Sequence, residues 1–335
     1  MKWLSMTDAP LQLYGLCVHE GHEFFRLPKN IIDKVNDGVT TLATHSAGGR
    51  VRFRTDVKEL SIRYAVQELP LSGNNMSCLG RSGADVYVDG IYRGGKGYNF
   101  LSSALISFTV QKQERMQDVE IYLPCYNRVL FFEIGFPDEA KIEAPKPYTV
   151  DVPVVFYGSS ITQGGAESRP GINYIATVCR KLDADFINLG FSGNARGEKT
   201  IRDYIASLKM SAFVLDYDHN APTIEHLQNT HYPFYEAVRA AQPDLPILMM
   251  SKPDFDADYS EPAMAENRIR RDIVKATYEK AIANGDKKVW FIDGEPLFGD
   301  TDRDSCTADG CHPNDLGFYR MAQTVYPVLK EMLGR

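Results

Sequence analysis

Up to residue 145, the chain alternates apolar and polar positions with a period of two. This alternation is typical of strands with one buried and one solvated face. Turn-forming pairs such as Asp89-Gly90 separate the alternating segments. The clearest of them are 51–54, 60–64, 85–88 and 119–123. The pattern predicts an antiparallel β-sandwich, jelly-roll-like in its connections, over residues 1–145.

Residues 137–153 contain four prolines and several charges, and we interpret them as a linker. Beyond it the pattern changes, beginning with a nearly continuous apolar run over Val152–Tyr157 that is typical of a strand buried on both faces. Further apolar runs lie at 186–189, 212–215, 246–250 and 289–292, with helices expected near 200–208, 223–241 and 263–284 and a last helix opening at Asn314. Strands alternating with helices predict a doubly wound parallel sheet over residues 150–335.

Composition narrows the classes of function. The 335 residues are 44% hydrophobic, which is enough to form a large core. The net charge of −7 and the lack of a basic stripe argue against nucleic-acid binding. No apolar run approaches the ~20 residues needed to cross a bilayer. We therefore expect a globular protein without a membrane span.

The six cysteines are scattered, with no zinc-ligand spacing. The opening residues lack the continuous apolar segment of a secretory signal. We therefore expect a cytoplasmic protein with free thiols. If the sequence is the mature form of a secreted protein, Cys306 and Cys311 are close enough in sequence to pair.

Sites in doubly wound sheets lie beyond the carboxyl ends of the strands. The first such segment, Gly158–Gly165, contains Ser160 on a predicted sharp turn that exposes its hydroxyl. An ordinary strand-to-helix turn is an alternative interpretation. A phosphate-binding loop is a weaker one, because neither GxGxxG nor GxxxxGK[ST] is present.

The second and third strands are followed by 188–195 and 216–221. In the second loop, Gly193 lets a backbone N–H approach a ligand without obstruction. In the third, Asn220 can present an amide donor, and we expect His219 and Tyr217 to line the substrate pocket. Metal binding at this third loop is an alternative, but no second cluster completes a site, so we expect no metal.

The last loop, 309–315, places Asp309 three residues before His312. Within one turn the carboxylate can meet the imidazole N–H and fix its tautomer. A turn without catalytic role is the alternative. Together, the four loops place a nucleophilic serine, a histidine base with its orienting acid, and oxyanion donors on one sheet edge.

These blocks, GSSITQG, NLGFSGNA, DYDHNA and DGCHPND, resemble those of the SGNH/GDSL hydrolase superfamily over residues 150–335. Gly83–Tyr87 resembles the GxDLY signature of the β-domain that precedes some of these esterases. The resemblance implies a flavodoxin-like, three-layer α/β hydrolase domain. It also implies Ser160 as nucleophile, His312 as base, Asp309 as its acid, and an oxyanion hole of Ser160, Gly193 and Asn220.

Two positions depart from the family pattern. Ser159 replaces the Asp of GDS, and the GxND block reads Asp218-His219-Asn220-Ala221. Both changes leave the reacting groups in place.

We therefore expect a serine esterase, without cofactor, that hydrolyses short acyl esters. Segment 251–262 is polar and acidic with two aromatics, and we expect it to lie over the site. Such a rim suits a saccharide ester, and the resemblance implies deacetylation of one. The alternatives are a lysophospholipid or longer-acyl esterase, and a catalytically idle carbohydrate-binding protein.

Overall fold

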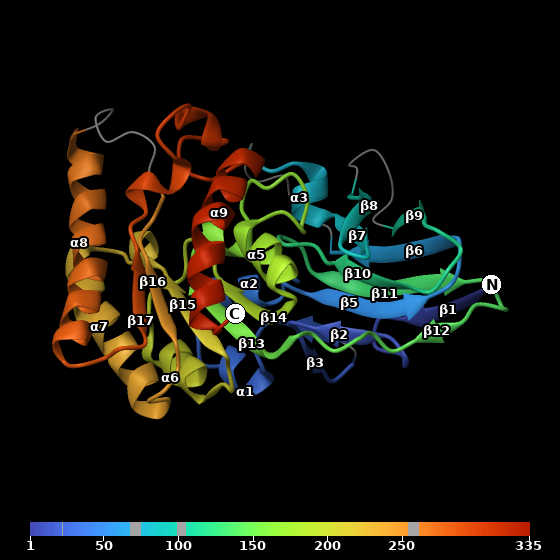
Figure 1. The fold of residues 1–335 in the computed structure, drawn as a ribbon, viewed down its shortest axis with the longest axis horizontal. Coiled ribbons are helices and arrows are strands. Elements are labelled where there is room, and N and C mark those ends of the chain that lie inside the picture. The colour runs from blue at the N-terminus through green and yellow to red at the C-terminus, as the bar shows by residue number, and fades with distance from the viewer. Residues whose placement is uncertain (22, 68–74, 99–104, 254–260) are drawn as a thin grey trace.

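The computed structural model describes residues 1–335 except 22, 68–74, 99–104 and 254–260. A β-sandwich forms the N-terminal half and an α/β layered unit forms the C-terminal half, side by side along the long axis (Figure 1). This is the predicted fold class.

Two antiparallel sheets build the sandwich, in the strand orders β1-β11-β6-β9 and β12-β5-β10-β7-β8, with β2 also paired to β5. Their bounds are β1 (Lys2–Ser5), β2 (Gln12–Tyr14), β5 (Arg50–Thr55), β6 (Glu59–Val66), β7 (Ala84–Val88), β8 (Ile91–Lys96), β9 (Leu105–Gln111), β10 (Gln117–Tyr122), β11 (Val129–Phe136) and β12 (Ile142–Glu143). The alternation predicted from sequence is confirmed: Val51 and Phe53 of β5 point into the same buried cluster as Ile62 of β6 and Ile134 of β11.

The predicted linker is more structured than its prolines indicate. It contains β12, which extends the edge of the sandwich by pairing with β5. A small hairpin of β3 (Cys17–His19) and β4 (Glu23–Phe25) and three short helices complete the N-terminal half. The helices are α1 (Lys29–Ile32), α2 (Asp37–Ala43) and α3 (Cys78–Ser82).

The C-terminal sheet is parallel, in the order β14-β13-β15-β16-β17. This is the flavodoxin-like order, in which the chain starts near one edge and reverses direction. The strands are β13 (Val150–Gly158), β14 (Ala184–Gly190), β15 (Ala212–Asp216), β16 (Ile247–Met250) and β17 (Val289–Ile292). The helices are α4 (Ser160–Gln163), α5 (Tyr174–Leu182), α6 (Lys199–Ser207), α7 (Ile224–Ala241), α8 (Glu261–Ala283) and α9 (Asp315–Met332), with 3₁₀ turns η1 (Asp218–Asn220), η2 (Glu295–Phe298) and η3 (Asp304–Cys306).

Strand β13 shows why its apolar run is continuous. Val154 and Phe156 belong to the core that α5 and α9 cover. Val155 and Tyr157 belong to the core on the other face, under α6, α7 and α8. Where helices cover both faces of a strand there is no solvated side, so the buried positions 154–157 are all apolar.

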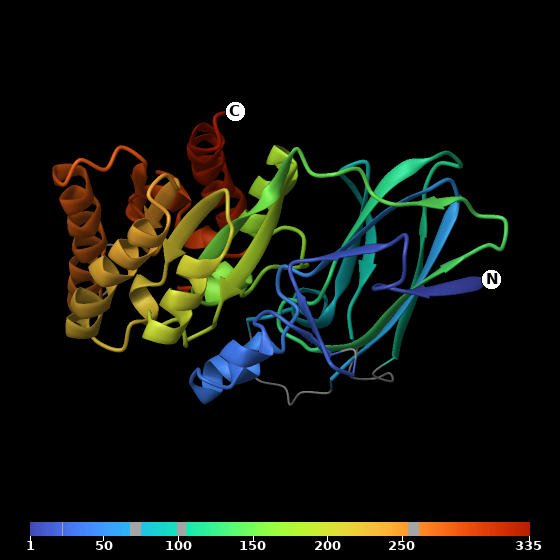
Figure 2. The same ribbon diagram turned by 90° about the horizontal axis from the view of Figure 1, so that it is seen from below.

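The N-terminal half also contributes to the second of these cores. Val39 and Ala43 of α2 lie in the same buried cluster as Phe213 and Met249 of the parallel sheet. Figure 2 shows these short helices, in blue, reaching toward the α/β half. The sequence pattern, with its weak helical periodicity before residue 145, did not predict this contribution. In the described part of the chain, no helix is both long and apolar enough to span a membrane.

Candidate active site

Ser160 lies at the carboxyl end of β13, as predicted. It is the first residue of α4, and the Ser159 hydroxyl caps the turn by accepting a hydrogen bond from Ile161 N at 3.1 Å. The helix is a single turn, so its dipole gives less help to developing negative charge than a long helix would. The capped turn does fix the direction of the Ser160 side chain.

His312 and Asp309 lie on the loop that leads into α9. Gly310, at a positive φ of 81°, permits the reversal between them. Asn314 caps α9 by accepting from Leu316 N and Gly317 N at 3.0 and 3.2 Å, which confirms the predicted helix start. The loop is thus fixed at its base by a helix cap.

The three side chains form a continuous chain of contacts. Ser160 Oγ lies 2.9 Å from His312 Nε2. On the other side of the ring, His312 Nδ1 lies 2.8 Å from Asp309 Oδ2. These are the contacts that a nucleophile, a base and an orienting acid require.

Asp309 is held as a carboxylate. Its Oδ1 accepts hydrogen bonds from the backbone N–H groups of His312 and Cys311, at 2.7 and 3.0 Å. Partial burial works to raise the pKa of Asp309, but these donors and the His312 ring outweigh it and lower the pKa to about 2. The carboxylate therefore stays ionised throughout the neutral range.

The predicted oxyanion donors follow three neighbouring strands. Gly158 of β13 is in register with Gly190 of β14 on one side and Asp216 of β15 on the other. Ser160, Gly193 and Asn220 come two to four residues after these aligned positions, so they share one sheet edge.

Their local conformations suit the predicted role. Gly193 has a φ of 67°, and among the described residues no heavy atom outside its chain neighbours lies within 4 Å of the position a Cβ would occupy. The Asn220 side chain accepts and donates no hydrogen bond with any described residue, and its Oδ1 is buried. An unpartnered amide at the sheet edge is available to a bound group.

His219, predicted to line the pocket, lies beside this edge. Its Nδ1 is 3.1 Å from Asp218 Oδ1, and its Nε2 is buried with no partner among the described residues. Burial lowers the pKa of His219; the hydrogen bond and charge of Asp218 oppose this shift, and Lys252 and His312 act in the same direction as burial. The neutral ring donates through Nδ1 and leaves Nε2 as an acceptor.

Tyr217 lies elsewhere. Its side chain is 0% exposed within the core under α7, and its hydroxyl lies 2.8 Å from Thr230 Oγ1. In this conformation the ring cannot reach a ligand at the sheet edge. The odd–even alternation along β15 explains its direction, because Tyr217 continues the Phe213 and Leu215 face.

Sequence reasoning missed a set of residues beneath the serine. Tyr126, from the sandwich half, donates to the Ser160 carbonyl at 3.0 Å. Gln163 donates to Cys125 O at 3.0 Å and accepts from Ser192 N at 3.1 Å. It therefore links the serine turn, the Gly193 loop and the sandwich. No local pattern marks these residues, because their partners are distant in sequence.

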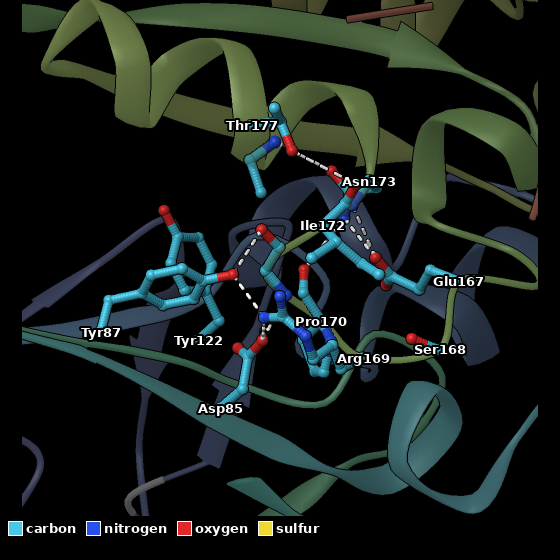
Figure 3. Close-up of polar contacts among 12 residues, drawn as sticks. Asp85, Tyr87, Tyr122, Glu167, Ser168, Arg169, Pro170, Ile172, Asn173 and Thr177 are labelled. Atoms are coloured by element: carbon cyan, nitrogen blue, oxygen red, sulfur yellow. Dashed lines mark hydrogen bonds and ion pairs between the residues drawn. The ribbon is translucent and has the colours of Figure 1, made fainter. Parts of the chain in front are cut away.

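Glu167 is buried in the same region. Its Oε2 accepts from Asn173 N and Nδ2, at 2.9 and 3.0 Å, while Oε1 has no partner among the described residues (Figure 3). Burial raises the pKa of Glu167 well above its usual value, and the Asn173 donors offset this only in part. The folded protein therefore favours the protonated, neutral form of this carboxyl group more than water does.

The GxDLY-like segment explains how the halves are joined. Asp85 accepts from Arg169 Nη1 at 2.7 Å and from Gly171 N at 3.1 Å, and Tyr87 donates to Gly171 O at 3.1 Å (Figure 3). Burial raises the pKa of Asp85 to about 6 although Arg169 acts against it. The motif fixes the 169–171 loop that follows the nucleophile turn.

Three further expectations concern a metal ion, the cysteines and the segment expected to lie over the site. Within the described residues, no group of three or more His, Cys, Asp or Glu side chains could hold a metal ion. The described cysteines form no disulfide. Much of segment 251–262, residues 254–260, lies outside the described residues.

Comparison with known families agrees with the geometry. The model of the GDSL-like Lipase/Acylhydrolase family matches residues 151–330. A second model, GxDLY, described as the N-terminus of Esterase SGNH hydro-type, matches residues 1–142. The protein belongs to the GDSL-like lipase/acylhydrolase family. It is an esterase or acylhydrolase, which confirms the resemblance drawn from the sequence blocks.

Solved structures share the whole two-part fold. A Bacteroides ovatus ATCC 8483 protein assigned to the GDSL-like lipases is 26% identical, with a TM-score of 0.88 over 99% of this chain and 98% of that one. The salicylyl-acyltransferase SsfX3 of a tetracycline biosynthetic pathway is 20% identical, with a TM-score of 0.82 over 100% and 99%. An acetyl xylan esterase, Est2A, from Butyrivibrio proteoclasticus is 12% identical, with a TM-score of 0.63 over 99% and 98%. The sequence has no significant match among curated proteins.

Proposed function

We propose that the protein hydrolyses short acyl esters, acetyl esters of carbohydrates above all, through a Ser160–His312–Asp309 triad. The observation that carries the proposal is the unbroken series of contacts of 2.9 and 2.8 Å from Ser160 Oγ through the His312 ring to Asp309. The series lies at the carboxyl edge of a parallel sheet, where doubly wound folds place their sites.

In the proposed reaction, Ser160 Oγ attacks the ester carbonyl while His312 Nε2 takes its proton. The carbonyl oxygen becomes an oxyanion and receives hydrogen bonds from Ser160 N, Gly193 N and the Asn220 amide. Removal of one such donor typically costs on the order of 10²–10³ in kcat.

The tetrahedral intermediate then collapses. Its bond to the leaving alcohol breaks, and His312 gives its proton to that alcohol. A water molecule then attacks the acyl-Ser160 ester while His312 takes a proton from that water. The bond to Ser160 Oγ breaks, His312 returns the proton to Ser160, and the carboxylic acid leaves. Asp309 stays ionised and stabilises the imidazolium in both halves of the cycle.

The saccharide preference has two supports. The neutral His219 ring offers Nε2 as an acceptor suited to a sugar hydroxyl. The fold is also shared with proteins described as carbohydrate esterases, among them a family two enzyme from Clostridium thermocellum in complex with cellohexaose. His219 is accordingly the proposed substrate-binding residue.

The test is release of p-nitrophenol from acetyl, butyryl and octanoyl esters by the native protein and Ser160→Ala. We expect turnover to be highest on the acetyl ester and to be lost in Ser160→Ala. Acetylated xylan or cello-oligosaccharide, followed by acetate release, then tests the saccharide class. Turnover rising with acyl length supports the alternative, a lysophospholipid or longer-acyl esterase.

A second candidate keeps the acyl-enzyme and changes the acceptor. The fold similarity to a salicylyl-acyltransferase extends over the complete chain. An acyltransferase passes the acyl group from Ser160 to a second alcohol in place of water. Product analysis with added sugar alcohols separates the two: ester formation in excess of acid release would replace hydrolysis with transfer.

A further inference from the structure

The carboxylate of Asp309 has one hydrogen-bond donor that its own loop does not supply. Three donors come from residues 311–312, as described above. The fourth is Asn75 Nδ2 of the sandwich half, 2.7 Å from Asp309 Oδ2. Two donors on each oxygen fill the acceptor capacity of the group and define its orientation completely.

The position of Asn75 relative to the imidazole is equally specific. Its Nδ2 lies 3.3 Å from His312 Nδ1. His312 Nε2 faces the Ser160 hydroxyl and must accept its proton, so Nδ1 carries the ring hydrogen and donates to Asp309. Asn75 and His312 are therefore two donors that converge on one carboxylate oxygen, and neither donates to the other.

The segment that follows Asn75 is fixed against the C-terminal half. Asn75 comes just before α3, which lies at the boundary between the halves (Figure 1). Ser77, the N-cap of α3, accepts from Gly80 N at 2.9 Å and donates to Ser168 O at 3.0 Å. Ser168 in turn binds Asp315 at the start of α9, through its N and Oγ, at 2.9 and 2.7 Å. The sandwich is thus docked next to the His312 loop.

We propose that Asn75 is a positioning residue through which the N-terminal half orders the Asp309–His312 pair for catalysis. The inference rests on the proposed function, since it assumes that this pair serves Ser160. It assigns the sandwich a part in the chemistry: a side chain 234 residues from Asp309 fixes the acid of the triad.

The residue type fits this role. A neutral amide donates a hydrogen bond without cancelling the negative charge that stabilises the imidazolium. A lysine or arginine at 2.7 Å would form an ion pair and compete with His312 for that charge. Asparagine therefore orients the carboxylate and leaves its charge directed at the ring.

The experiment measures kcat and KM of the full chain on p-nitrophenyl acetate. Asn75→Ala removes the donor, and Asn75→Asp replaces it with an isosteric group that cannot donate when ionised. We expect Asn75→Ala to lower kcat about tenfold with KM unchanged, as loss of a hydrogen bond to a charged group predicts. We expect Asn75→Asp to lower kcat at least as much. An Asn75→Asp enzyme with native kcat would overturn the proposal, because shape alone would then suffice.

A double-mutant cycle tests whether Asn75 acts through Asp309. In the Asp309→Ala background, adding Asn75→Ala is expected to leave the residual kcat unchanged. Additive losses, or a rise in KM, would overturn the proposal by indicating a separate contact with the substrate. Ser77→Ala is the matched control: it loosens the docking contact to Ser168 without touching Asp309. An equal fall in kcat for Ser77→Ala would also overturn the proposal.

Ser160→Ala distinguishes the two levels of inference. If Ser160→Ala keeps native activity, the proposed function fails whatever Asn75 does. If Ser160→Ala is inactive and the Asn75 variants equal the native enzyme, only the positioning role of Asn75 fails.

Discussion

Carboxyl groups at the carboxyl edge of the parallel sheet and at the buried boundary between the two halves have pKa values shifted in opposite directions. At the edge, Asp309 is one-third exposed and receives two donors on each oxygen, and its pKa falls to about 2. At the boundary, Glu167 is 1% exposed with donors on one oxygen only, and its pKa is raised well above the usual value. Asp85, buried but paired with Arg169, is intermediate, with a pKa raised to about 6.

The difference shows that donor number and access to water decide the charge of a carboxyl group more than its residue type does. The edge maintains a charge that the proposed chemistry requires. The boundary maintains neutral or paired groups, which are the only ones that can be buried without a large desolvation cost. Three substitutions test this contrast.

The largest effect is expected from Asp309→Asn. The amide keeps the shape but removes the charge that stabilises the His312 imidazolium, and its NH₂ group can turn the ring to the wrong tautomer. We expect kcat to fall on the order of 10³–10⁴-fold. Steady-state kinetics on p-nitrophenyl acetate measure the loss, with the thermal unfolding midpoint as the control for folding. A variant with kcat within tenfold of the native value would show that the charge of Asp309 is not required for catalysis.

Asp85→Asn is expected to act on stability. At pH 7.5 the native Asp85 is ionised, and its loss leaves the partly buried Arg169 without its carboxylate. We expect the free energy of unfolding to fall by about 2–3 kcal/mol, less than for a fully buried pair because Arg169 retains some contact with water.

Urea denaturation of Asp85→Asn measures this loss, and two comparisons test its cause. Because the folded pKa of Asp85 lies above the unfolded one, the native protein gains stability as the pH falls from 7.5 to 5 and asparagine does not, so the difference is expected to widen at pH 5 by about 1 kcal/mol. Adding Arg169→Met is expected to restore part of the stability, since the uncompensated charge is then gone. A loss that is the same at pH 5 and pH 7.5 would contradict the raised pKa of Asp85, because the folded residue would then not titrate between these two pH values.

Glu167→Gln is expected to give the smallest effect, visible as a pH dependence. The unfolded Glu167 releases its proton near pH 4.3, whereas the folded residue keeps it to a higher pH. Between these two pKa values, the native protein loses about 1.4 kcal/mol of stability from this group per unit rise in pH, and glutamine does not titrate. The free energy of unfolding of Glu167→Gln should therefore rise relative to that of the native protein as pH increases.

Unfolding free energies of both proteins at pH 5.5 and 7 test the Glu167 prediction. Other titrating groups, such as the buried Asp216, contribute equally to both and cancel in the difference. A difference that stays constant with pH would mean that Glu167 is already ionised in the folded state.

The features that could be predicted from the sequence depend on local pattern, or on the rule that sites in doubly wound sheets lie beyond the carboxyl ends of the strands. The apolar run of 152–157, the cap at Asn314 and the short Asp309–His312 spacing each follow from neighbouring residues. Because parallel strands end at a common edge, the loops after them could be assigned to one site before any distance was known.

Features that depend on distant contacts could not be predicted in this way. Asn75 has no motif around it, and its importance follows only from docking against a loop 234 residues away. Tyr217 stands two residues before His219, yet strand alternation turns it into the core. The raised pKa of Glu167 depends on its burial, and residues of both halves, among them Gly80 and Asn173, lie against it.

The insertion of α2 into the core of the α/β half has a consequence for biosynthesis. Val39 and Ala43 emerge from the ribosome long before the strands carrying Phe213 and Met249, so their apolar face waits for partners that are made last. A fragment cut at residue 150 would leave the sheet with an uncovered apolar patch. Gene fusion or domain exchange at that boundary would therefore separate two parts of one core.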